Sequence, residues 1–141
     1  MKLPLTSVMC AVMAYVSVPE EVPVPLSAEL HYALTDPYAV RLSLGAPEAK
    51  PVNWVFARSL LAEGLRRPAG MGDVLISPNR DSRPHSTCIV LRSAAGAALI
   101  EIAVGEIVAF LKHTFMLVPS GEETLHIDLD HAVVELTSRG E

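Results

Sequence analysis

The side chains best suited to metal chemistry lie near the C-terminus, where His126, Asp128, Asp130 and His131 fall within six residues. Imidazole and carboxylate groups both bind metal ions, but this spacing matches no standard metal site. Asp128 is also a good N-cap for a helix that would begin after it. Asp130 would then lie in the first turn, where the helix dipole favours acids. We therefore interpret the cluster as a helix start and predict no metal and no cofactor.

The motifs that mark many enzymes are missing from this sequence. It contains neither a GxSxG nucleophile turn nor a GxxxxGKS/T phosphate loop, and Gly70 and Gly72 do not lead into a helix. His31 and His113 have no evident partners for a catalytic triad. Cys88 lies in an aliphatic segment, where a reactive thiolate is disfavoured. The sequence therefore predicts that this chain is not an enzyme.

Positive charge is concentrated in the middle of an otherwise acidic chain. Residues 50–92 hold seven basic and three acidic residues, whereas the remainder holds four basic and thirteen acidic ones, for a net charge of -5. This charge could simply complement the chain's own acids. Arginines near turns are also favoured at protein interfaces, which makes them our candidates for a partner-binding surface. The candidates are Arg66, Arg67, Arg80 and Arg83.

Binding of single-stranded nucleic acid is the alternative that this basic segment raises. Such binding needs exposed aromatic side chains interleaved with positive charge. The aromatics of the segment, Trp54 and Phe56, alternate with Val52 and are predicted to face the core. The overall acidity of the chain also opposes phosphate binding. We therefore predict no nucleic-acid partner and keep this function as the alternative to protein binding.

A long apolar run near the N-terminus has two interpretations. Lys2 followed by apolar residues resembles a secretion signal, but Pro4 interrupts the run and no Ala-x-Ala cleavage site follows. No stretch reaches the roughly 20 apolar residues that span a bilayer. We predict instead that Ser7–Val18 is a strand buried on both faces, which needs a cover because an exposed apolar edge promotes aggregation. The isolated Cys10 and Cys88 fit a reducing compartment.

Alternating apolar residues predict further strands along the chain. Leu26–Thr35 and Tyr38–Leu44 alternate around an Asp-Pro turn at 36–37, which predicts a hairpin. The next strand carries Val52, Trp54 and Phe56 on one face. Three more strands are predicted at Asp73–Ser77, Ser86–Ser93 and Ala97–Ala103.

Helices are predicted at three places. Ser59 should cap a short helix, Leu60–Leu65, with Gly64 near its end and a Gly70–Gly72 turn beyond it. Gly105–Met116 carries an apolar stripe at helical spacing, formed by Ile107, Phe110, Leu111 and Thr114. The third helix follows Asp128. Strands followed by a helix thus occur twice, with a final helix, so we predict one α+β domain over residues 1–141 with antiparallel sheets.

The longest recognisable segment reads Trp54-Val-Phe-Ala-Arg58, Leu60-Leu61-Ala-Glu63-Gly64-Leu65 and Pro68-x-Gly70-x-Gly72-Asp73-Val74. Shorter segments follow the same order at Asp36-Pro37-Tyr38-Ala39-Val40, Phe110-Leu111-x-x-Thr114, Val118-Pro119-x-Gly121 and Asp128-Leu129-Asp130. Together they resemble the SsgA-like proteins, small regulators of cell division and sporulation in filamentous actinomycetes. Family members usually have Asp where this chain has Ser59, and their N-terminal strand is less uniformly apolar.

The resemblance implies a Whirly-like fold, assembly as a homotrimer and a role that is not enzymatic. It implies contact with cell-division or cell-wall proteins, such as FtsZ or another SsgA-like protein, to recruit or position the septum machinery during sporulation. It also implies a location in the cytoplasm at the cell septum.

Overall fold

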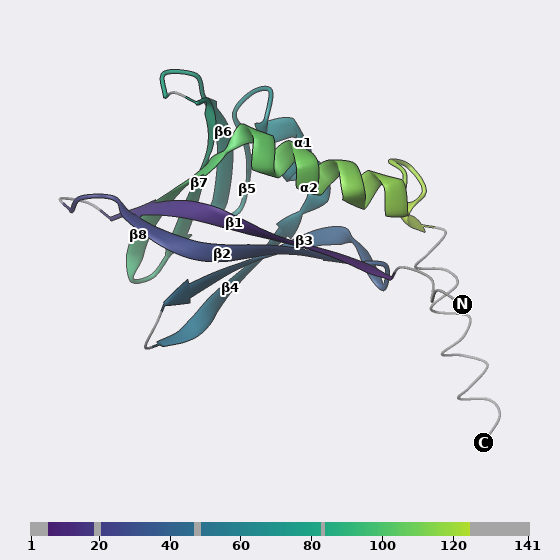
Figure 1. Cartoon of the computed structure of the whole chain (residues 1–141), viewed down its shortest axis with the longest axis horizontal. Helices are drawn as coiled ribbons and strands as arrows, with labels where there is room; N and C mark the ends of the chain where they lie inside the picture. Colours follow the sequence, from purple (N-terminus) through teal and green to yellow (C-terminus); the bar gives the residue numbers. More distant parts are fainter. Residues whose placement is uncertain (1–5, 19–20, 47–48, 83, 125–141) are drawn as a thin grey trace.

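The computed structural model describes residues 6–18, 21–46, 49–82 and 84–124. Within these residues, eight strands form one antiparallel sheet and two helices lie on one of its faces (Figure 1). The strands are β1 (Ser7–Ser17), β2 (Val24–Ala33), β3 (Asp36–Ala46), β4 (Ala49–Ala57), β5 (Ala69–Met71), β6 (Val74–Asn79), β7 (Ser86–Ser93) and β8 (Gly96–Ala103). The helices are α1 (Arg58–Gly64) and α2 (Val104–Leu117). This architecture confirms the predicted α+β class, and the Whirly-like fold stays a prediction.

The sheet curls because its two edge strands are consecutive in the sequence. The order across the sheet is β4-β3-β2-β1-β8-β7-β6-β5, which puts β4 and β5 at opposite edges. They are joined by a short turn and by α1, whose seven residues span only about 10 Å. α1 contacts β3 and β4 on one side and β5 and β6 on the other. The connection therefore draws the two edges of the sheet toward each other.

The hairpin of β2 and β3 confirms the alternation seen in the sequence, but its turn lies earlier than predicted. Leu34 and Thr35 form the turn, and Asp36 and Pro37 already belong to β3. The prediction of a turn at 36–37 was therefore wrong. The ladder resumes at once with the Ala33–Asp36 pair, and a proline near the start of a strand is tolerated.

β1 overturns the prediction of a strand buried on both faces. Val8 and Ala14 are buried on the face that meets α2, whereas Met9, Met13 and Tyr15 on the other face are 54%, 44% and 51% exposed. The strand is not an edge either, since it pairs with β2 and β8 in the middle of the sheet. β1 is therefore buried on one face only, although both of its faces are apolar.

α1 begins before the residue predicted to cap it. Its N-cap is Ala57, with extended backbone and no side-chain capping hydrogen bond, and Ser59 lies exposed inside the first turn. The prediction of Ser59 as the N-cap was wrong because β4 runs directly into the helix: Ala57 is still paired with Ala39 of β3. Gly64 ends the helix as predicted.

α2 confirms the predicted helix and its buried stripe. It packs against β1, β7 and β8. The buried residues of the helix are Ile107, Phe110, Leu111 and Thr114. The predicted third helix after Asp128 and the cluster from His126 to His131 lie outside the described residues.

The apolar face of β4 reaches the core only at its C-terminal end. Phe56 is 6% exposed, Trp54 is half-buried and Val52 is 54% exposed, so only part of the predicted core face is buried. The reason is that β4 is an edge strand, and the helices cover only the end that leads into α1.

The second half of the sheet agrees with the three predicted strands, which correspond to β6, β7 and β8. β5 was not predicted, because Gly70 was interpreted as a turn residue and instead lies inside this strand. Gly72 does form the turn, with a φ of 61° that favours glycine.

Candidate functional site

Three of the predicted partner-binding arginines are placed at the C-terminal end of α1. The Arg80 guanidinium donates to the Arg66 carbonyl oxygen at 3.1 Å, which links the loop after β6 to the turn after α1. Arg67 donates to the Glu63 carboxylate at 3.0 Å, and both side chains are exposed. The structure thus brings Arg66, Arg67 and Arg80 together, whereas Arg83 lies outside the described residues.

Arg66 and Arg67 border a cleft of 310 Å³ between α1 and the segment that leaves α2. The lining contains charges of both signs, because Glu63 and Glu123 join the arginines, and Phe115 and Ser120 complete it. Of the two carboxylates in the cleft, Glu63 pairs with Arg67 and Glu123 pairs with Arg58.

The floor of this cleft is formed by Arg58, a buried residue that the sequence analysis did not single out. Its side chain is 2% exposed, and its guanidinium donates to the carbonyl oxygens of Thr114 at 3.1 Å and Val118 at 2.7 Å. It also donates to Glu123 Oε1 at 2.6 Å. Arg58 therefore fixes the C-terminal end of α2 and the segment after it to the start of α1.

Two aromatic rings complete the surroundings of Arg58. Its guanidinium carbon lies 4.2 Å from the centre of the Phe115 ring and 4.9 Å from that of Tyr32. Burial raises the pKa of the Tyr32 hydroxyl to about 12, so this group stays protonated and donates to the Pro37 carbonyl oxygen at 2.8 Å.

Glu123 is the ionised partner in this arrangement. Burial alone would raise its pKa, but hydrogen bonds from its own backbone N–H, from Arg58 and from the Gly121 N–H lower the pKa below its ordinary value. The carboxylate is therefore charged at neutral pH and balances the buried guanidinium.

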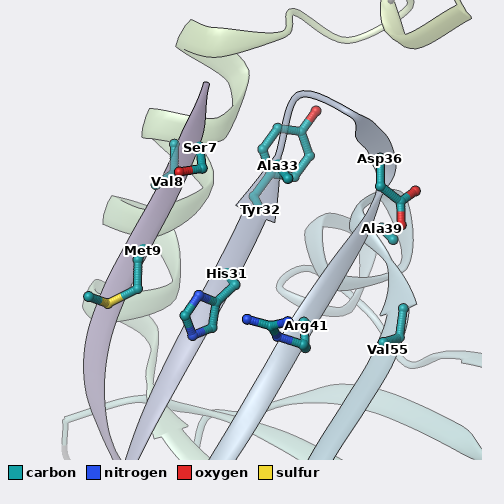
Figure 2. Close-up of a pocket in the computed structure, with 10 residues that line it drawn as sticks. All are labelled: Ser7, Val8, Met9, His31, Tyr32, Ala33, Asp36, Ala39, Arg41 and Val55. Atoms are coloured by element: carbon teal, nitrogen blue, oxygen red, sulfur yellow. The ribbon is translucent and has the colours of Figure 1, made fainter. Parts of the chain in front are cut away.

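A second concave site lies on the sheet face that the helices leave uncovered. This hollow, 460 Å³ in volume, is formed by residues of β1, β2, β3 and β4 (Figure 2). It lies where the pairing of β2 and β3 is irregular: His31 pairs with Arg41 and Ala33 with Asp36, which leaves Tyr32 opposite four residues of β3. The extra residues open the sheet locally and create the depression.

The two cysteines, Cys10 and Cys88, line neither of these sites. Burial raises the pKa of the Cys10 and Cys88 thiols, and the Glu101 carboxylate adds to the effect at Cys88, so neither is an activated nucleophile. Across residues 6–124 as described, no three His, Cys, Asp or Glu side chains gather as a metal site would require. None of the helices in the described part of the chain is long and apolar enough to cross a membrane.

Comparison with known proteins identifies the family. Residues 26–123 match the family described as "Streptomyces sporulation and cell division protein, SsgA". The chain belongs to the SsgA family. The match begins within β2, ends one residue before the last described residue, and includes the whole Trp54–Val74 segment. A role in sporulation and cell division follows for this SsgA family member, and the resemblance seen in the sequence is confirmed.

Two SsgB proteins are similar to this chain over most of its length. The sporulation-specific cell division protein SsgB of Thermobifida fusca is 41% identical over 92% of this chain and 94% of its own length. SsgB of Streptomyces coelicolor is 43% identical over 89% of this chain and 91% of its own.

Solved structures agree with this assignment. The SsgA-like sporulation-specific cell division protein from Thermobifida fusca superposes with a TM-score of 0.88 at 40% identity, covering 96% of this chain and 98% of that chain. SsgB of Streptomyces coelicolor, described with mutations that correlate to longitudinal cell division during sporulation, superposes with a TM-score of 0.81 at 42% identity. It covers 86% of this chain and 95% of that chain. The sheet and helices are therefore those of the SsgA-like structures.

Proposed function

We propose that this protein acts without enzymatic chemistry, by contacting proteins of the septum machinery and recruiting or positioning them during sporulation-specific cell division. The observation that carries the proposal is the exposed arginine group beside the α1 cleft, in a chain whose family is defined by sporulation and cell division. Arginine forms bidentate contacts with carboxylates and is favoured at interfaces.

The partners that fit this role are FtsZ, cell-wall synthesis proteins or another SsgA-like protein. The protein would act in the cytoplasm at the septum, as a homotrimer with a Whirly-like fold. The partner surface comprises Arg66, Arg67, Arg80 and Arg83, of which the first three are gathered at the end of α1.

The test replaces these four arginines with alanine and follows a fluorescent fusion in sporulating hyphae. We expect the variant to unfold at nearly the wild-type temperature, to lose its septal position and to capture less of the division proteins. Arg92→Ala and Lys112→Ala remove exposed positive charge elsewhere and should leave both readouts unchanged. Unchanged septal localisation of the folded quadruple variant would refute the assigned surface.

The wild-type chain and the quadruple variant also distinguish protein contact from the alternative function, binding of single-stranded nucleic acid. Salt-sensitive retention of single-stranded DNA, lost in the quadruple variant, would support the alternative function in place of protein contact. We expect no retention.

A further inference from the structure

One row of side chains crosses four strands on the sheet face opposite the helices. Met9 of β1 pairs with His31 of β2, His31 pairs with Arg41 of β3, and Arg41 pairs with Val55 of β4. Figure 2 shows the His31 ring and the Arg41 guanidinium side by side, with Met9 and Val55 beyond them. The row therefore has an apolar side chain at each end and a histidine and an arginine in the middle.

The two ends of this row are apolar side chains that the sheet does not bury. The two end residues remain largely in solvent, at 54% exposed for Met9 and 61% for Val55. Exposed apolar side chains that frame donor groups are typical of a surface that another molecule covers.

The charges around the row leave Arg41 available. His31 Nε2 donates to Glu29 Oε1 at 3.0 Å, which holds this carboxylate on β2. Among the described residues, none of the ion pairs involves Arg41. Asp36 is the other carboxylate at the hollow, and it lies at the far end, next to the turn (Figure 2). The row therefore offers an exposed guanidinium to an incoming anion.

We propose that this hollow binds an extended segment of a partner protein in which an acidic side chain lies between two apolar ones. The acid would be held by Arg41, and the apolar side chains would cover Met9 and Val55. The proposal builds on the protein-contact role proposed above but uses the opposite side of the molecule from the arginine group.

The spacing of the row defines the segment. Three strand-to-strand steps separate Met9 from Val55, a distance of about 14 Å at the usual strand spacing. In an extended peptide, side chains at positions i, i+2 and i+4 share one face, and the outer two are about 13 Å apart. The matching pattern is apolar-x-acidic-x-apolar, running across the strands.

The test measures fluorescence anisotropy of labelled peptides with the full chain. The probe is a nine-residue peptide with a central Leu-Ser-Asp-Ser-Leu, and the matched peptides carry Asn or Lys in place of Asp. We expect the Asp peptide to bind about fivefold more tightly than the Asn peptide, which is the upper range for an exposed ion pair. The difference should shrink in high salt.

Variants of the chain locate the contact. Arg41→Gln should abolish the preference for Asp over Asn, whereas Asp36→Asn should increase it by removing the carboxylate at the far end of the hollow. Arg92→Gln is the control, because Arg92 is exposed on β7, outside the row, and makes the same charge change. Val55→Ser should weaken all three peptides equally.

Several results would overturn the proposal. These are no measurable binding of any peptide, equal binding of the Asp and Asn peptides, or an equal loss with Arg92→Gln. A change in sedimentation mass on Arg41→Gln would assign the hollow to contact between copies of this chain. Displacement of the probe by a peptide copying residues 125–141 would assign it to the chain's own C-terminal residues. Because the assay needs no dividing cells, its failure leaves the proposed function untouched.

Discussion

Replacing Arg58 with methionine tests how the two helices are held together. Methionine has a similar length and keeps most of the buried volume, but it removes the guanidinium. The carbonyl oxygens of Thr114 and Val118 then lose their donor, and Glu123 is left as a largely buried carboxylate without its counter-charge.

The expected loss of stability follows from these contacts. Removing one partner of a buried ion pair costs about 3–5 kcal/mol, because the remaining charge stays desolvated and unpaired. For a chain of this size, such a loss lowers the melting temperature by about 10–20 °C. The ring contacts with Phe115 and Tyr32 add to the loss and are contained in the same measurement.

The assay is urea unfolding followed by Trp54 fluorescence, with Arg67→Met as the matched control. Arg67 forms an exposed pair with Glu63, so its replacement should change the free energy of unfolding by less than about 0.5 kcal/mol. In a double-mutant cycle, Arg58→Met with Glu123→Leu should lose less than the sum of the single variants. If Arg58→Met destabilises no more than Arg67→Met, or if the two losses simply add, the buried ion pair does not stabilise the packing of the helices.

Three further predictions concern Glu123, Thr87 and the glycines of the two helices. Hydrogen bonds lower the pKa of Glu123 in the folded state, so its contribution to the free energy of unfolding is present above the pKa of the unfolded state and is lost as pH falls through the folded pKa. Glu123→Gln should therefore make the melting temperature fall less steeply between pH 7 and pH 3. Thr87 Oγ1 is buried and finds no hydrogen-bond partner among the described residues, so Thr87→Val should stabilise by about 1 kcal/mol in chemical unfolding, and a loss would contradict this. A methyl group on Gly64 would collide with Ile76, whose Cβ lies 2.6 Å from the added atom, so Gly64→Ala should destabilise by about 1–3 kcal/mol. Gly105→Ala in the open first turn of α2 should instead gain about 0.5 kcal/mol, and similar effects at both positions would argue against the close packing of α1 on β6.

Patterns with a clear period were predicted well from the sequence. The stripe on α2 repeats at helical spacing, and the hairpin strands alternate, so their buried faces follow directly. β1 was mistaken because Met9, Met13 and Tyr15 are apolar yet face solvent. The composition of a strand gives its hydrophobicity but does not determine whether another element packs on each of its faces.

The two sites could not be read from single segments. Arg58 is held by residues more than 50 positions away, at Thr114, Val118 and Glu123, and only the fold brings these groups together. The row at Arg41 draws its side chains from four strands and depends on their register. A buried arginine at the start of α1 could have been suspected only from the apolar residues around it.

Partner contact through the arginine surface is tested by counting sporulation septa in an actinomycete from which the gene for this protein has been deleted. The strain is complemented with the wild-type chain or with the folded variant that lacks Arg66, Arg67, Arg80 and Arg83. We predict that the wild-type chain restores sporulation septa and that the variant, at equal protein level, does not. Full restoration of septa by the variant would contradict partner contact through this surface.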